Sequence, residues 1–151
     1  MPVRGIWTPQ AEVLCLSCHG QRQWNGRPAP SPEAWQRRGD SVRPSADEAE
    51  TRCDRCGCGI VVAADVAVLH AVCRDLRSAG LRQAAMEQTG GMCAAVLIPM
   101  ADGGRVQVYA DEVRAATFIV AKAGPGAADE DEVATVRGRA GVVAAVKRAM
   151  S

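Results

Sequence analysis

Two pairs of cysteines constrain this chain of 151 residues more than any other feature of its sequence. Cys15 and Cys18 form the first Cys-x-x-Cys pair, Cys53 and Cys56 form the second, and a glycine follows each pair within two residues. Two intervening residues allow one tight turn to aim both sulfur atoms at a single ion, and the glycine lets the chain turn back. Four thiolates from two such turns are the set that Zn²⁺ binds in a closed tetrahedral site. The sequence therefore predicts a structural Zn²⁺ site formed by Cys15, Cys18, Cys53 and Cys56.

The segment between the two pairs is 34 residues long, which is more than the usual spacing in a small zinc-binding domain. Lengthening a loop from about 15 residues to about 34 adds roughly 0.7 kcal/mol to the entropic cost of closing it. Zinc binding by four thiolates contributes about 10–16 kcal/mol at neutral pH. Because the metal term is much larger, we expect the segment to be an insertion between two metal-binding turns.

Several other interpretations of these cysteines remain open at the level of sequence. Cys58 is able to replace Cys56 as a ligand, although it would then pair with Cys53 across four residues. Iron bound by four thiolates is the alternative metal. Cys15-x-x-Cys18-His19 also matches the attachment pattern of c-type haem, and a redox-active dithiol is a further option. The structural zinc site is preferred, because residues 1–20 show no export signal and the strand-turn-helix context of a redox dithiol is missing.

The two cysteine pairs resemble the knuckles of zinc-ribbon (rubredoxin-like) domains over roughly residues 11–63. The resemblance implies that Cys15, Cys18, Cys53 and Cys56 are the ligands and that the metal is structural. His19 stands where many zinc ribbons have glycine, so it is expected beside the site or as a hydrogen-bond donor behind it. Zinc ribbons serve in transcription machinery, in protein docking and as structural staples, so the resemblance does not select a function.

Composition divides the chain into two regions. Residues 1–59 contain all three tryptophans, most of the prolines and five of the seven cysteines. This region is expected to be rich in loops and held together by something other than a hydrophobic core. Residues 60–151 are rich in alanine and valine with regular periodicity. We therefore predict a zinc-ribbon domain over residues 1–62, with a long insertion between its knuckles, and an α+β domain over residues 63–151.

Periodicity predicts the order α-β-β-β-α for the second domain, with helices packed on a small antiparallel sheet. Asp65 suits a helix start and Gly80 a helix stop, and Asp102-Gly103-Gly104 is a turn signal between two strands. A short apolar run over 60–63 precedes the first helix. The expected elements are a helix over 65–79, strands over 93–99, 105–109 and 117–122, an exposed acidic linker over 124–132, and a terminal helix marked by Val142, Val143, Val146 and Met150.

A second resemblance lies in the segment that runs from Glu87 through Thr89-Gly90-Gly91-Met92-Cys93 to Ala94 and continues to Asp102-Gly103 and Asp111. It is similar to a segment of small uncharacterised proteins of bacteriophages that infect high-GC actinobacteria. The use of 16 arginines against two lysines agrees with such an origin. The segment covers about a sixth of the chain and implies no known activity.

The insertion between the knuckles is the most unusual candidate surface. Residues 19–46 carry five arginines against one glutamate and one aspartate, a balance of 5 − 2 = +3, with two tryptophans interleaved. Guanidinium groups contact phosphates, and aromatic faces stack on unpaired bases or anchor a partner protein. Packing of the tryptophans onto the ribbon is the simplest interpretation, and docking to another protein is the alternative function. If the surface works by binding, nucleic acid or its machinery is the preferred partner, contacted through Arg22, Trp24, Arg27, Trp35, Arg37 and Arg38.

Net charge limits the strength of such binding. The whole chain has a formal charge of +1. Residues 1–62 have 8 basic and 7 acidic side chains, and four thiolates with one Zn²⁺ add −2, so the loaded domain is close to neutral. Binding to phosphate is therefore expected to be modest and sensitive to salt.

The remaining expectations concern catalysis and location. Cys93 with His70 and Asp102 or Asp111 would be the candidates for nucleophilic catalysis. Because Cys93 opens an apolar strand and His70 lies at the flank of a helix, we expect a buried thiol and no enzyme. The absence of an export signal and of a long apolar run predicts a cytoplasmic protein without a membrane partner.

Overall fold

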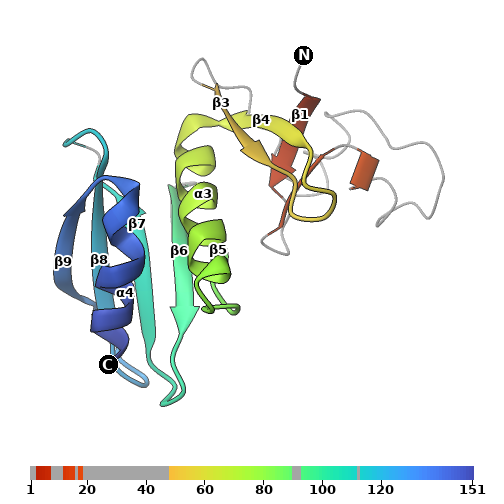
Figure 1. Ribbon diagram of the computed structural model, residues 1–151. Helices are drawn as coiled ribbons and strands as arrows, with labels where there is room; N and C mark the ends of the chain where they lie inside the picture. The colour runs from red at the N-terminus through yellow and green to blue at the C-terminus, as the bar shows by residue number, and fades with distance from the viewer. Residues whose placement is uncertain (1–2, 8–11, 16, 19–47, 90–92, 112) are drawn as a thin grey trace. The chain divides into compact units, whose positions relative to one another are not determined.

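The computed structural model describes residues 3–7, 12–15, 17–18, 48–89, 93–111 and 113–151 (Figure 1). The chain divides into two compact units, Met1–Val68 and Leu69–Ser151. The division falls within helix α3 (Ala64–Ser78). The domain boundary that composition places at residues 62 and 63, near the start of this helix, stays a prediction.

In the described part of the first unit, four strands form one sheet in the order β2-β1-β4-β3. The strands are β1 (Val3–Trp7), β2 (Val13–Cys15), β3 (Glu48–Arg52) and β4 (Gly59–Ala63). The β1–β4 pair is parallel, and the other two pairs are antiparallel. The side chains of Val13, Leu14 and Ile60 are fully buried. This unit therefore has an apolar core, which differs from the expectation of a region held together by something other than a hydrophobic core.

The described residues of the second unit form a five-stranded antiparallel meander, in which each strand pairs with the next along the chain. The strands are β5 (Ala85–Thr89), β6 (Cys93–Pro99), β7 (Arg105–Ala110), β8 (Thr117–Ala123) and β9 (Asp131–Arg137). A short 3₁₀ helix, η2 (Arg139–Gly141), leads into α4 (Val142–Met150). The described residues combine the helices α3 and α4 with mostly antiparallel sheets, so the mixed α+β class is confirmed.

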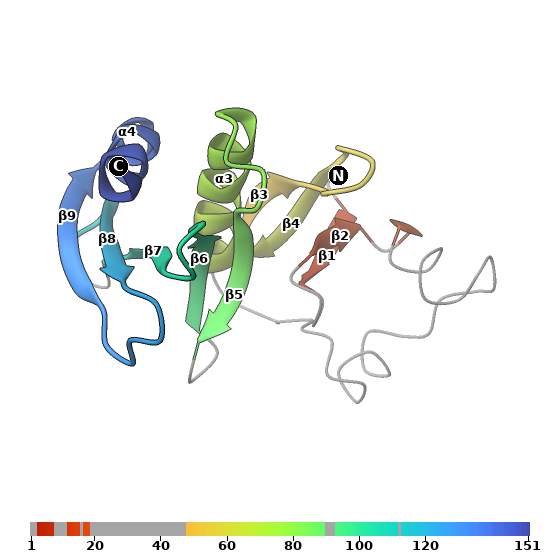
Figure 2. The ribbon, with the colours of Figure 1, turned by 90° about the horizontal axis from the view of Figure 1, so that it is seen from below.

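The core of the second unit lies between its sheet and its helices. Val96 is directly opposite Val108, which is directly opposite Val120, and all three side chains are fully buried. Figure 2 shows α4 and the second-unit part of α3 on one face of this sheet. Alternation along β7 places Val106 and Val108 on the buried side while Gln107 is only half-buried, as expected for a sheet covered on one face.

Helix α3 begins and ends close to where the sequence predicts. Asp65 lies in its first turn, where a negative side chain interacts favourably with the positive end of the helix dipole. At its end Gly80 takes a positive φ of 100°, and the N–H of Leu81 donates to the carbonyl of Leu76 at 3.0 Å. This pattern is a Schellman cap, which a residue with a side chain adopts at a cost in strain.

Two strands of the second unit were not predicted. β5 has the sequence Ala-Met-Glu-Gln-Thr, which has few β-favouring residues, so only its pairing with β6 makes it a strand. β9 begins at Asp131, so the expected acidic linker over 124–132 is wrong in its last two residues. An edge strand that is exposed on much of its surface needs no apolar run, and acidic side chains there discourage pairing with other sheets.

Replacement of a buried residue of α3 tests the core of the second unit. Leu76 is fully buried, so we expect Leu76→Ala to lower the free energy of unfolding by about 2–5 kcal/mol, through lost burial and a cavity. Urea titration followed by circular dichroism measures the change. Val133→Ala in β9, whose side chain is 48% exposed, serves as the control and should change stability by less than about 0.5 kcal/mol. Equal effects of the two variants would contradict this description of the core.

Candidate metal centre

The two cysteine pairs lie at the ends of strands of the first unit. Cys15 is the last residue of β2, with Cys18 three residues later, and Cys53 directly follows β3. The turn that contains Cys56 joins β3 to β4 and is closed by two backbone hydrogen bonds. The N–H of Cys53 donates to the carbonyl of Cys58 at 2.9 Å, and the N–H of Gly57 donates to the carbonyl of Cys53 at 3.0 Å. Gly57 has a φ of 75°, so a glycine suits this turn sterically.

Two hydrogen bonds join β2 to the turn that carries the second cysteine pair. The N–H of Asp54 donates to the carbonyl of Val13 at 2.9 Å. In return, the N–H of Val13 donates to a carboxylate oxygen of Asp54 at 2.8 Å. These reciprocal bonds join residues 41 positions apart and place the Cys53 turn beside the end of β2. Asp54 was not recognised in the sequence, because a carboxylate between two cysteines does not reveal a partner so distant in the chain.

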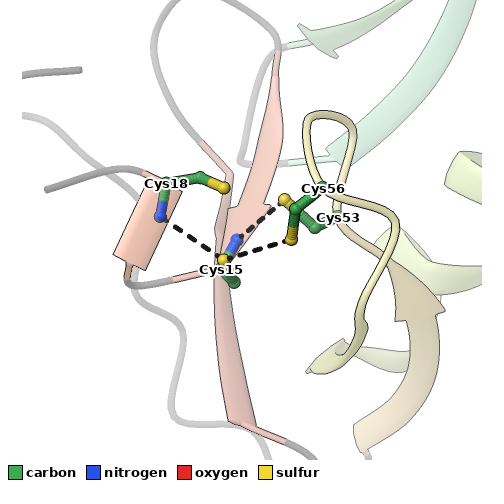
Figure 3. Close-up of side chains that lie close together, drawn as sticks. All are labelled: Cys15, Cys18, Cys53 and Cys56. Carbon is green, nitrogen blue, oxygen red and sulfur yellow. Dashed lines mark hydrogen bonds between the residues drawn. The ribbon is translucent and has the colours of Figure 1, made fainter. Parts of the chain in front are cut away.

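The sulfur atoms of Cys15, Cys18, Cys53 and Cys56 all lie within 4.8 Å of one another (Figure 3). The Sγ atoms of Cys15 and Cys56 are 3.8 Å apart. Four thiolates placed tetrahedrally at about 2.3 Å from Zn²⁺ would stand about 3.8 Å apart. The four residues therefore form a compact cluster whose size fits one tetrahedral metal ion.

Backbone N–H groups surround the cluster. The N–H of Cys15 and the N–H of Arg55 each donate to the sulfur of Cys53 at 3.4 Å. The N–H of Cys18 donates to the sulfur of Cys15, also at 3.4 Å. Such donors stabilise a thiolate relative to a thiol, so they favour the form of cysteine that binds a metal. Cys15, Cys18 and Cys53 are buried, whereas Cys56 is exposed, so the cluster reaches the protein surface at one ligand.

Burial and hydrogen bonds shift the pKa values of these cysteines in different directions. Burial raises the pKa of Cys18 well above that of an ordinary thiol. Burial also acts to raise the pKa of Cys53, but backbone N–H donors, including that of Cys15, outweigh it and the net pKa is lowered. The backbone N–H of Cys58, followed by the Cys58 thiol, lowers the pKa of Cys56 to about 6. The hydrogen bond to Cys56 raises the pKa of Cys58 to about 12. Part of the cluster is therefore anionic at neutral pH while its neighbours keep their protons.

Cys58 is exposed, follows Cys56 after one residue, and is not one of the four cysteines whose sulfur atoms lie within 4.8 Å of one another. His19 lies outside the described residues, and so does the whole expected partner surface, which consists of Arg22, Trp24, Arg27, Trp35, Arg37 and Arg38.

The candidates for catalysis fall at separate structural positions. His70 is fully buried, so its expected place at the helix flank is wrong. It lies four residues after Val66 and three before Cys73, which puts it on the buried face of α3. Asp102 accepts a hydrogen bond from the N–H of Gly104 at 2.8 Å, and Asp111 accepts one from the N–H of Val113 at 2.8 Å. Each carboxylate thus contributes to its own turn. The side chain of Cys93 lies outside the described set.

Comparison of the chain with protein-family models, with curated proteins and with solved structures gave no match. The zinc-ribbon and bacteriophage resemblances therefore stay predictions, and the interpretation of the cysteine cluster rests on its own geometry. Among the described residues, no helix is long and apolar enough to cross a membrane.

The low pKa of Cys56 predicts how this residue reacts once metal has been removed by a chelator. Its thiolate forms as pH rises through about 6, so its rate of alkylation should increase between about pH 5 and about pH 7 and then level off. Mass spectrometry after brief exposure to iodoacetamide locates the modified cysteine. Cys58→Ala removes one donor to the thiolate and should move the profile to higher pH. An alkylation profile for Cys56 centred near the ordinary thiol value of about 8.5 would contradict this description.

Proposed function

We propose that Cys15, Cys18, Cys53 and Cys56 bind one structural Zn²⁺ ion that fixes the first unit as a zinc ribbon. The observation that carries the proposal is the placement of four sulfur atoms within 4.8 Å of one another, with one pair at the 3.8 Å expected for a tetrahedron about Zn²⁺. Zn²⁺ binds well to four thiolate ligands. Iron also binds such a site, and metal analysis would distinguish the two.

A structural role for the metal follows from its complete coordination. Four thiolates occupy every position of a tetrahedral Zn²⁺, so no position is left for water or substrate. The ion would join the end of β2 to the turn between β3 and β4, and in doing so would close the 34-residue segment between them. We accordingly propose a binding protein that is not an enzyme. The cytoplasm is the proposed location, because its reducing conditions keep such thiols free to bind metal.

Metal analysis of the purified protein tests this proposal. We expect one Zn²⁺ per chain, and we expect Cys18→Ser to lose it, because serine does not supply a thiolate. Zinc at about a thousand times its Kd should stabilise the first unit by about 4 kcal/mol, measured by urea unfolding with and without a chelator. Cys73→Ala provides the matched control, because Cys73 is a buried cysteine of α3 outside the cluster and its removal should leave the metal content unchanged. A metal-free protein of undiminished stability would refute the proposal.

The proposed partner is nucleic acid or a protein of nucleic-acid machinery. Support comes from the sequence of residues 19–46, with their formal charge of +3 and their interleaved Trp24 and Trp35. The proposed metal site lies at both ends of this segment, since Cys18 precedes it and Cys53 follows it. A metal ion that holds Cys18 and Cys53 together would restrict the conformations that the segment between them can adopt. Less conformational entropy would then be lost when the segment binds a partner. The actinobacteriophage resemblance is compatible with this role but adds no evidence for it.

Salt dependence distinguishes a nucleic-acid partner from a protein partner. If Arg37 and Arg38 contact phosphates, their joint replacement by alanine should reduce the steepness of log K against log salt by about 1.4 for a single-stranded oligonucleotide. Trp24→Ala should weaken binding at all salt concentrations without changing the slope, because stacking involves no counterions. Fluorescence anisotropy measures both effects. Undetectable oligonucleotide binding at low salt would favour the alternative, an adaptor or inhibitor that docks on a host protein.

A further inference from the structure

The charged side chains of the second unit are separated between its helices and its sheet. The helix layer consists of residues 69–84 and 139–151, which contain the second-unit part of α3, the turn after it, η2 and α4, and its helices lie on one face of the sheet (Figure 2). It has six basic side chains and one acidic side chain, a balance of 6 − 1 = +5. Residues 85–138, which contain the sheet, have four basic and eight acidic side chains, a balance of 4 − 8 = −4. The small net charge of this unit therefore conceals a strongly basic helix layer.

Three basic residues of the helix layer are exposed and have no acidic partner. The one acidic residue of the layer, Asp75, pairs with Arg139 at 2.9 Å, and this ion pair joins α3 to η2. Arg82, Lys147 and Arg148 are exposed, and their side chains form no ion pair or hydrogen bond with any residue that the structure describes. Their charges are therefore available to a partner outside the chain.

Compensation of the helix dipoles does not account for this charge. Arg77 lies in the last turn of α3, and Lys147 and Arg148 lie in the last turn of α4. The C-terminus of a helix carries the equivalent of about half a negative charge, so two helices together offset about one positive charge. The helix layer has a net charge of +5, and Arg82 lies outside both helices. Most of the positive charge therefore serves no need of the helices themselves.

We propose that the helix layer binds the phosphate backbone of double-stranded DNA. This inference rests on the proposed nucleic-acid function for the class of its partner, and it adds a contact surface in the second unit. Guanidinium and ammonium groups form charge-assisted hydrogen bonds with phosphate oxygens, and the release of counterions from the duplex favours binding without regard to sequence. The basic side chains of the layer are Arg74, Arg77, Arg82, Arg139, Lys147 and Arg148.

The composition of the helix layer favours duplex DNA over other polyanions. Residues 69–84 and 139–151 contain no tryptophan, tyrosine or phenylalanine on which unpaired bases would stack. They contain only three hydroxyl or amide side chains that could contact the 2′-hydroxyl groups of duplex RNA. The large apolar side chains that are exposed in the described structure, those of Val68, Val113 and Val133, lie outside the layer, whereas a helix that binds a membrane needs such side chains to enter the lipid. The phosphates of a DNA duplex require none of these groups.

Replacement of two charges of the helix layer in the full-length protein tests the inference. With a fluorescein-labelled DNA duplex of mixed sequence as the probe, Lys147→Ala with Arg148→Ala should weaken binding several-fold at low salt and reduce the steepness of log K against log salt by about 1.8. Arg105→Ala with Arg114→Ala is the matched control, because it removes two positive charges that are paired with acidic side chains of residues 85–138. The control should leave the steepness unchanged. Equal effects of the two double variants, or no effect of either, would overturn the inference.

A single variant keeps the inference testable if the double variant in α4 does not fold. Arg82 is exposed in the turn after α3, so Arg82→Ala removes one charge without changing a helix. It should reduce the steepness of log K against log salt by about 0.9 for the same duplex. A steepness equal to that of the wild type would contradict the proposed contact.

The arginines of the insertion separate this inference from the proposed function. If joint replacement of Arg37 and Arg38 weakens duplex binding while the changes in the helix layer have no effect, the inference fails and the proposed contact of the insertion stands. If only the changes in the helix layer matter, the inference stands and the proposed contact of the insertion fails. Binding of the wild type to phosphatidylserine vesicles but not to the duplex would overturn the inference in favour of a membrane surface.

Discussion

The four closely spaced sulfur atoms of the first unit repel one another when they are ionised, and this repulsion limits how many of them carry a charge. Two unit charges about 4 Å apart repel by about 4 kcal/mol near a protein surface, so four thiolates within 4.8 Å of one another do not ionise together without a cation. The pKa values of the cysteines differ for other reasons, because burial raises that of Cys18 and the backbone N–H of Cys58 lowers that of Cys56. A divalent ion at the centre would replace repulsion by coordination, and the backbone N–H groups that already point at sulfur would then stabilise the bound thiolates.

Hydrogen bonds that need no metal bring the two turns together. The pair of bonds between Val13 and Asp54 sets the Cys53 turn against the end of β2, and the parallel pairing of β1 with β4 connects the same two regions through the sheet. With Leu14 and Ile60 buried, the unit has a small apolar core as well as its cysteine cluster. The second unit has its own core around Val108, so the consequences of metal removal should be concentrated in the first unit.

The elements that the sequence predicted well are those with strong local signals. The apolar run at 93–99 is a strand with those bounds, and the helix expected over 65–79 forms one residue earlier, over Ala64–Ser78. β5 and β9 were missed because alanine, glutamate and aspartate become a strand only when a neighbouring strand supplies hydrogen-bond partners. His70 was misplaced because the buried face of α3 is wider than a single stripe of apolar residues indicates.

The spacing of the cysteines determined, by itself, that four sulfur atoms were candidates for one ion. Two residues between cysteines fix the reach of each turn, and that reach is a local property of the chain. Only the tertiary structure decided that the two turns meet and that Cys56 is the exposed member of the four cysteines. The meeting of the two turns depends on hydrogen bonds between Val13 and Asp54, 41 positions apart, and no pattern in the sequence encodes a hydrogen bond between such distant partners.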